Sequence, residues 1–119
     1  MATKLDAPKW IQDGKDMIPQ AEAELAAGNY GMAAHLANRA ADTFVKGICL
    51  KVTGNELTGN SLAANCRQTS HFHKKLMTVF ADCAQLDGFF VPEGQSPKAV
   101  TKEAAEKAIA QAKKVMTTE

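Results

Sequence analysis

The chain has 119 residues, and its 14 basic and 13 acidic side chains give a net charge of +1. This length suits one domain, and the near-neutral balance excludes attraction of nucleic acid or membrane by bulk charge, so either would need a local basic patch. The sequence contains no run of about 20 apolar residues, the length of a membrane-spanning helix. Its first residues, MATKLDAPKW, lack an apolar signal core, so the expected location is the cytoplasm.

The first predicted helix spans about residues 6–27. Asp6 is suited to the N-cap and Pro8 to the first turn. Pro19 removes a backbone donor and is expected to kink or break this helix. Its apolar stripe contains Trp10, Met17, Ile18, Ala21 and Leu25.

The second predicted helix spans residues 30–53 and shows the strongest periodicity in the chain. The alanines at its start would let another helix approach closely, and Gly54 suits the left-handed C-cap. The apolar positions recur at steps of three and four, at Ala33, Ala34, Ala37, Ala41, Phe44, Val45, Ile48, Cys49 and Val52.

Two further helices are predicted, at residues 61–86 and 101–117. The first has a seam that should face the core, at Leu62, Asn65, Thr69, Phe72, Leu76, Val79, Cys83 and Leu86. Residues 87–97 form a loop that Phe89 and Phe90 are expected to pack against the bundle. The last helix starts at Thr101 and has an apolar face at Ala105, Ala108, Ile109, Ala112, Val115 and Met116.

These four segments predict an all-α fold, because no strand pattern competes with them. Short connections favour antiparallel neighbours, so the expected architecture is an up-and-down four-helix bundle that forms one domain over residues 1–119. The three cysteines, Cys49, Cys66 and Cys83, include no CxxC pair and fit neither a disulfide framework nor a zinc site. They are interpreted as small core side chains in a reducing compartment.

The stretch AAGNYGMAAHLANRAADTFVKGICLKVTG, residues 26–54, resembles the core helix pair of the HEPN family of small helical bundle proteins. The positions that carry the resemblance are Gly28, Tyr30, Ala33, Ala40, Asp42, Lys46 and Gly54, with Asp where Glu is usual. The C-terminal VTKEAAEKAIAQAKKVM is similar to the family's last helix. The resemblance implies a homodimer.

Two other interpretations of this stretch are available. Gly28, Tyr30, Ala33 and Ala40 also resemble half of a tetratricopeptide repeat, but no second copy follows at a period near 34 residues, and solenoids need about three. Asp42 and Lys46, four residues apart, would form a surface ion pair worth about 0.2–0.5 kcal/mol if exposed.

The segment CRQTSHFHKK, residues 66–75, concentrates titratable side chains. Active HEPN proteins are metal-independent ribonucleases with an arginine, four to six residues and a histidine, so the resemblance implies Arg67 and His73 as catalytic candidates. The arginine would hold a phosphate, and the histidine would assist attack by the ribose 2′-hydroxyl. The residue after the arginine is usually polar and often Asn, for which Gln68 is only a loose substitute. The residue after the histidine is commonly aromatic, but here it is Lys74.

Helical geometry favours less specific interpretations of the same segment. On a regular helix Arg67 and His73 point about 120° apart, so a joint site needs a second chain or an irregular helix. His73 would otherwise be a boundary histidine that is hydrogen-bonded to a neighbouring helix. The remaining basic residues form either a solvated face or an anion- or RNA-binding surface, at Arg67, His71, Lys74 and Lys75.

No metal site or cofactor is expected. His71 and His73 are two residues apart and diverge by about 200° on a helix, whereas zinc-binding pairs on a helix sit three or four apart.

Two functions from different classes are therefore predicted. The first is a nucleic-acid- or nucleotide-associated module, either a weak ribonuclease of toxin type or the partner of a separately encoded nucleotidyltransferase. The second is a non-catalytic bundle that acts as a protein-interaction adaptor. The imperfect motif favours a protein that is not an enzyme.

Overall fold

The structure, a computed structural model, describes residues 2–119 and contains no strand in that range. The all-α class is therefore confirmed. The α-helices are α1 (Ala7–Ala26), α2 (Tyr30–Thr53), α3 (Leu62–Ser70), α4 (Phe80–Leu86) and α5 (Lys102–Met116). The 3₁₀ segments are η1 (Lys4–Asp6), η2 (Lys74–Val79) and η3 (Asp87–Phe89). No helix in the described range is both long and apolar enough to cross a membrane.

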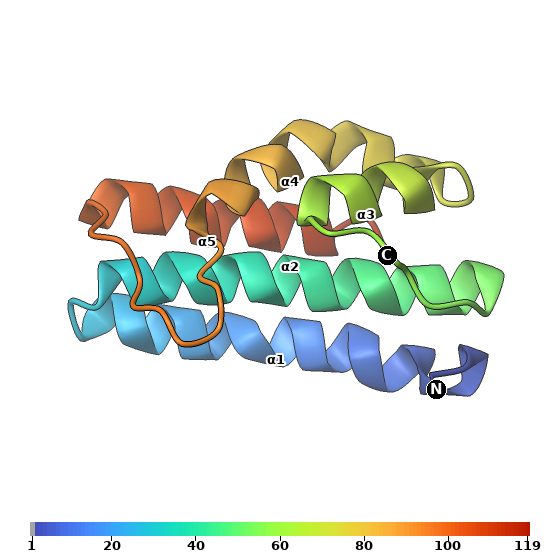
Figure 1. Cartoon of the computed structure of the whole chain (residues 1–119), viewed down its shortest axis with the longest axis horizontal. Helices are drawn as coiled ribbons and strands as arrows, with labels where there is room; N and C mark the ends of the chain where they lie inside the picture. Colours follow the sequence, from blue (N-terminus) through green and yellow to red (C-terminus); the bar gives the residue numbers. More distant parts are fainter. Residues whose placement is uncertain (1) are drawn as a thin grey trace.

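Helix α2 is the central element of the fold. It is antiparallel to α1 and also contacts α3, α4 and α5 (Figure 1). Residues 90–101 have no helix and run back over α2 and α1 to the start of α5 (Figure 1). The predicted core of α2 is confirmed, because every predicted apolar position except Val52 is buried.

Helices α1 and α2 pack so closely that the backbone of each lies against a glycine of the other. A Cβ atom on Gly14 would lie 2.8 Å from the carbonyl oxygen of Ala40, and a Cβ on Gly47 would lie 2.7 Å from the amide nitrogen of Ile11. Glycines, rather than the alanines of the prediction, make these contacts. The expected break at Pro19 is wrong, since α1 continues through that residue to Ala26.

The third predicted helix is interrupted, so the prediction of exactly four helices is not confirmed. The backbone amides of Phe72 and His73 both donate to the carbonyl oxygen of Thr69, which closes α3. His73 then takes an extended φ of −141°. Ser, His, Phe and Thr all have modest helix propensity, and here five such residues run consecutively over 69–73.

The interruption changes the direction in which side chains point. In η2 the buried residues are Leu76 and Val79, three apart, as expected for three residues per turn. All other members of the predicted seam are buried, but Phe72 at the break is 65% exposed. The prediction that Phe72 faces the core is therefore wrong.

The loop after α4 is fastened to α2 through His35. The backbone amide of Val91 donates to His35 Nδ1 at 3.1 Å. Phe89 packs against the core as predicted, whereas Phe90 is 49% exposed. The predicted burial of Cys49, Cys66 and Cys83 is confirmed, and all three are free thiols.

We expect Gly47→Ala to lower the free energy of unfolding by about 1–3 kcal/mol, because the new methyl group would push α1 away from α2. Urea unfolding followed by circular dichroism measures this change. Gly88→Ala is the matched control, since a Cβ atom there meets nothing within 4 Å. Equal stability of the two variants would show that the close approach is not a constraint.

We expect acid to loosen the contact between His35 and the loop. Burial lowers the pKa of His35 below its usual value of 6.5, and the positive charge of Arg39 lowers this pKa further. A backbone hydrogen bond with Phe89 acts in the opposite direction and is outweighed. The unfolded chain therefore binds the proton more readily than the folded chain does. The contribution of His35 to stability should be complete above pH 6.5. It should be lost as the pH drops through the lowered pKa of His35 in the folded chain.

Urea unfolding at a series of pH values tests this expectation. His35→Gln keeps an acceptor for the Val91 amide but cannot titrate, so its stability should change less with pH across this window. The same pH dependence in both proteins would assign the effect to other groups.

Candidate functional site

The predicted basic residues surround the break between α3 and η2. We call Arg67, His71, Lys74 and Lys75 the basic segment. All four side chains are exposed. Within residues 2–119, no carboxylate lies within ion-pair distance of any of them. Phe72 lies in the middle of this segment, and its ring is mostly exposed to solvent.

Arg67 is held by an aromatic side chain. Its guanidinium carbon lies 5.0 Å from the centre of the Phe80 ring, which places a cation over an aromatic face across the α3–α4 pair. This contact orients the arginine while leaving its N–H donors free to bind an anion.

His73 is half-buried and bonded to the end of the chain. Its Nε2 atom is hydrogen-bonded to the carbonyl oxygen of Thr118, after α5. A carbonyl oxygen can only accept, so Nε2 donates and carries a proton. That nitrogen has no lone pair free to act as a general base in this arrangement.

The two catalytic candidates therefore have separate partners. Among the hydrogen bonds of the described chain, none joins Arg67 to His73. The helix is irregular between them, which is one of the conditions for a joint site, but each side chain is occupied elsewhere. Their catalytic role stays a prediction.

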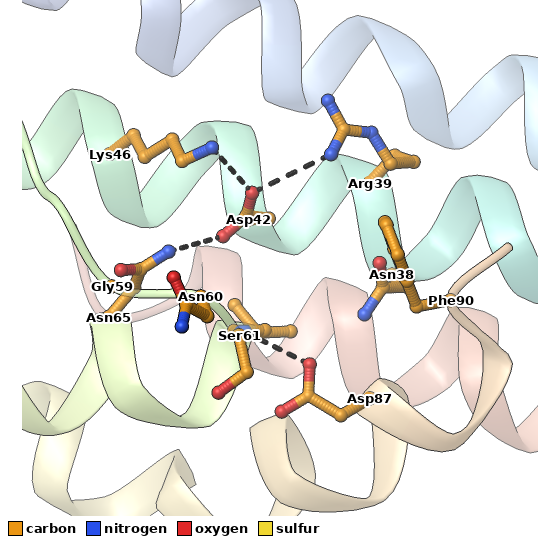
Figure 2. Close-up of a pocket in the computed structure, with 11 residues that line it drawn as sticks. Asn38, Arg39, Asp42, Lys46, Gly59, Asn60, Ser61, Asn65, Asp87 and Phe90 are labelled. Carbon is orange, nitrogen blue, oxygen red and sulfur yellow. Dashed lines mark hydrogen bonds and ion pairs between the residues drawn. The ribbon is translucent and has the colours of Figure 1, made fainter. Parts of the chain in front are cut away.

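A second cluster of polar residues centres on Asp42. Lys46 Nζ lies 2.9 Å from Asp42 Oδ2, and Arg39 Nη1 lies 3.7 Å from the same oxygen. Asn65 on α3 donates to Asp42 Oδ1 at 2.9 Å (Figure 2). The expected surface pair is thus present, but Asp42 is only 7% exposed, so the expectation of a solvent-exposed site is wrong.

Asp87 fixes the start of α3 beside this cluster. Its two carboxylate oxygens accept from the backbone amides of Leu62 and Ala63, each at 2.9 Å. Carboxylates are stabilised there because the first amides of a helix have no partner within it. Ser61 adds a conventional N-cap by accepting from the Ala64 amide at 3.1 Å.

A cavity of about 230 Å³ opens between these two carboxylates. We call it the Asp42 pocket. Its walls come from α2, the loop before α3, and the residues that follow α4 (Figure 2). The lining residues are Asn38, Arg39, Asp42, Lys46, Gly59, Asn60, Ser61, Leu62, Asn65, Asp87 and Phe90.

Sequence reasoning did not identify this pocket. One signal was available, because Asn65 is an amide in a seam that is apolar except for it and Thr69; the structure buries it to 2% exposure. A buried amide needs a polar partner, and the structure supplies Asp42. Arg39, Asn38 and Asp87 carry no comparable sequence signal.

Thiol and metal chemistry have little support in this fold. A hydrogen bond with Cys66 and burial raise the pKa of the Cys83 thiol well above its usual value of 9.0, so it stays protonated and unreactive. Residues 2–119 include no group of three or more His, Cys, Asp or Glu side chains that could hold a metal ion.

Comparison with known structures shows the fold independently. The crystal structure of TT1696 from Thermus thermophilus matches with a TM-score of 0.82 and 22% sequence identity, over 95% of this chain and 94% of that chain. Identity at this level shows a shared fold only. Comparison with curated proteins found no match.

The family model of the HEPN domain matches residues 7–119. The match includes every α-helix of the structure and both polar clusters described above. The chain therefore belongs to the HEPN domain family.

Proposed function

We propose that this HEPN domain is a nucleic-acid-binding module that binds single-stranded RNA without cleaving it. The observation that carries the proposal is the basic segment, in which exposed basic residues without a carboxylate partner flank an exposed phenylalanine in the sequence. The net charge of +1 offers no general attraction, so binding would rest on this local surface.

The charges of the basic segment supply the contact to phosphate. Arg67, Lys74 and Lys75 are exposed and lack a carboxylate partner, so binding a phosphate would not first require breaking an ion pair. Arginine can hold phosphate with two parallel hydrogen bonds, and lysine adds a point charge. Neutralised phosphates release counterions, which makes such binding sensitive to salt.

Phe72 supplies the contact to a base. Its backbone amide is tied to the carbonyl oxygen of Thr69 at 2.9 Å, so the ring projects from a fixed turn. Unpaired bases stack on such rings with little sequence preference, whereas paired bases do not present their faces. The combination of ring and cations therefore favours single strands over duplexes.

The state of His73 favours binding over cleavage. Removal of a proton from a ribose 2′-hydroxyl needs a basic nitrogen within reach; Nε2 donates its hydrogen to Thr118, so only Nδ1 has a lone pair for this step, and no hydrogen bond of the described chain joins the ring to Arg67. Arg67 remains able to hold a phosphate from its place over Phe80. The homodimer and the nucleotidyltransferase partner stay predictions from the family resemblance.

A protein-interaction adaptor is the second candidate. Met77 in η2 is 64% exposed and lies a few residues from Phe72, so two large apolar side chains face solvent near the break. Exposed apolar patches of this kind often mark protein contacts. This candidate predicts that Phe72 and Met77 matter for a protein partner while the charges of Lys74 and Lys75 do not.

We expect the double variant Lys74→Gln/Lys75→Gln to bind labelled single-stranded RNA more weakly and with less dependence on salt. If both lysines contact phosphate, the slope of log affinity against log salt should become shallower by about 1.4. Fluorescence anisotropy at several salt concentrations measures the slope. Lys102→Gln/Lys107→Gln is the control, since it removes the same charge from exposed sites on α5.

Two results would contradict the proposal. One is an absence of RNA binding by the unaltered protein at low salt. The other is an equal loss of affinity in the two double variants, which would assign binding to overall charge.

We expect Phe72→Ala to weaken binding of single-stranded RNA by roughly 5- to 100-fold, because stacking on one base is worth about 1–3 kcal/mol. Phe72→Tyr keeps a ring and should retain most of the affinity.

Denaturing gels of RNA incubated with the unaltered protein should show no cleavage. Cleavage that disappears in Arg67→Ala or His73→Gln would establish a ribonuclease instead.

A further inference from the structure

The Asp42 pocket has properties of a ligand site that the basic segment does not share. Its walls include three polar residues that are nearly buried, Asn38, Asp42 and Asn65. It opens between α2 and α3 and is lined by none of the four residues of the basic segment. Its chemistry can therefore be considered by itself.

Both carboxylates of the pocket are already satisfied. Asp42 accepts from Asn65 and pairs with Lys46 and Arg39, while Asp87 accepts from two backbone amides of α3. The N-terminus of α3 contributes roughly half a positive charge beside Asp87. The negative charges of Asp42 and Asp87 are therefore already compensated by protein groups before any ligand enters.

Most groups with unused capacity are donors, and one is an acceptor, the buried Oδ1 of Asn65, which has no hydrogen-bond partner. Arg39 makes only a 3.7 Å ion pair with Asp42, and no hydrogen bond of the described chain involves its guanidinium. Lys46 has further N–H groups beyond its contact with Asp42, and the Ser61 hydroxyl accepts from Ala64 while its own hydrogen is free. Surplus donors beside satisfied carboxylates favour a ligand with an oxyanion.

One wall of the pocket is aromatic. Phe90 is 49% exposed, lines the pocket and stands next to Arg39 and Asn38 (Figure 2). The ring also packs near His35, with 6.1 Å between the ring centres. A flat group could lie against Phe90 while an acidic group reaches Arg39.

The volume limits the size of this ligand. A cavity of about 150 Å³ is enough to hold a benzene molecule. The 230 Å³ of the Asp42 pocket therefore accommodates one ring with one acidic group, and little more.

We propose that the Asp42 pocket binds a small acid that has one planar ring and one oxyanion, either a carboxylate or a phosphate monoester. Arg39 holds the oxyanion with support from Lys46 and the Ser61 hydroxyl, and Phe90 covers the ring. Asp42 and Asn65 position Lys46 and the start of α3 without touching the ligand.

Titration of the ¹⁵N-labelled protein with benzoate and, separately, with phenyl phosphate tests the proposal by nuclear magnetic resonance. We expect saturable shifts of the backbone amides near Arg39, Ser61 and Phe90. Arg39→Gln should raise the dissociation constant roughly 10- to 100-fold, because a hydrogen-bonded charge is lost. Lys102→Gln removes one exposed charge from α5 and should leave it unchanged. Thermal unfolding of each variant verifies that the fold is intact.

The two probes separate the two sources of the oxyanion. Tighter binding of benzoate assigns the pocket to carboxylates, and tighter binding of phenyl phosphate assigns it to phosphate monoesters. Acetate and inorganic phosphate, which lack a ring, should each bind about tenfold more weakly than their ring-bearing counterparts, as expected for burial of one ring.

Three results would overturn the proposal. These are the absence of saturable shifts with both probes, equal affinity for the probes with and without a ring, and shifts confined to the basic segment. The last result would show only that exposed cations attract anions. It would leave the proposed RNA binding intact, so the two ideas fail separately.

Discussion

The close packing of α1 against α2 is the constraint on which the other contacts depend. Gly14 and Gly47 leave no room for a methyl group between the two helices. One face of α2 is filled by α1, so α3, α4 and α5 must pack on what remains of its surface. Asp42 lies on this remaining surface, where it meets Asn65 of α3.

Asp42 illustrates how a buried charge can position helices. Removing a carboxylate from water is costly unless charges and hydrogen bonds replace the lost hydration. Lys46 and Arg39 come from the same helix as Asp42, whereas Asn65 comes from α3, and its side-chain amide donates to Asp42 only when α3 is docked. The carboxylate therefore selects one position of α3 on α2, and Asp87 fixes the first turn of that helix.

Helical periodicity was enough to predict the fold class and the bounds of α2 to within a residue. It failed over 61–86 because apolar residues three apart suit both an α-helix and a 3₁₀-helix. Leu76 and Val79 are buried under either geometry, so their spacing could not show the change. Phe72 shows the consequence, because its position in the sequence matches the spacing of the predicted seam but its side chain lies outside the core.

The candidate site was less predictable, because its contacts join residues far apart in the chain. The spacing of Asp42 and Lys46 predicted their ion pair, which is local to one helix. The burial of Asp42 depends on α3, and the pocket depends on Asp87 and Phe90 beyond α4. A one-dimensional pattern gives the direction of each side chain on its own helix but not the helix that it will meet.

The hydrogen bond between His73 and Thr118 connects the break in the third predicted helix to the end of the chain. α3 stops at Ser70 and the backbone turns, and the imidazole reaches Thr118, the second residue after α5. The same turn moves Phe72 into solvent, and Arg67, on the other side of the turn in sequence, lies over Phe80. The interruption that would allow a joint catalytic pair therefore also occupies the histidine and exposes the aromatic ring.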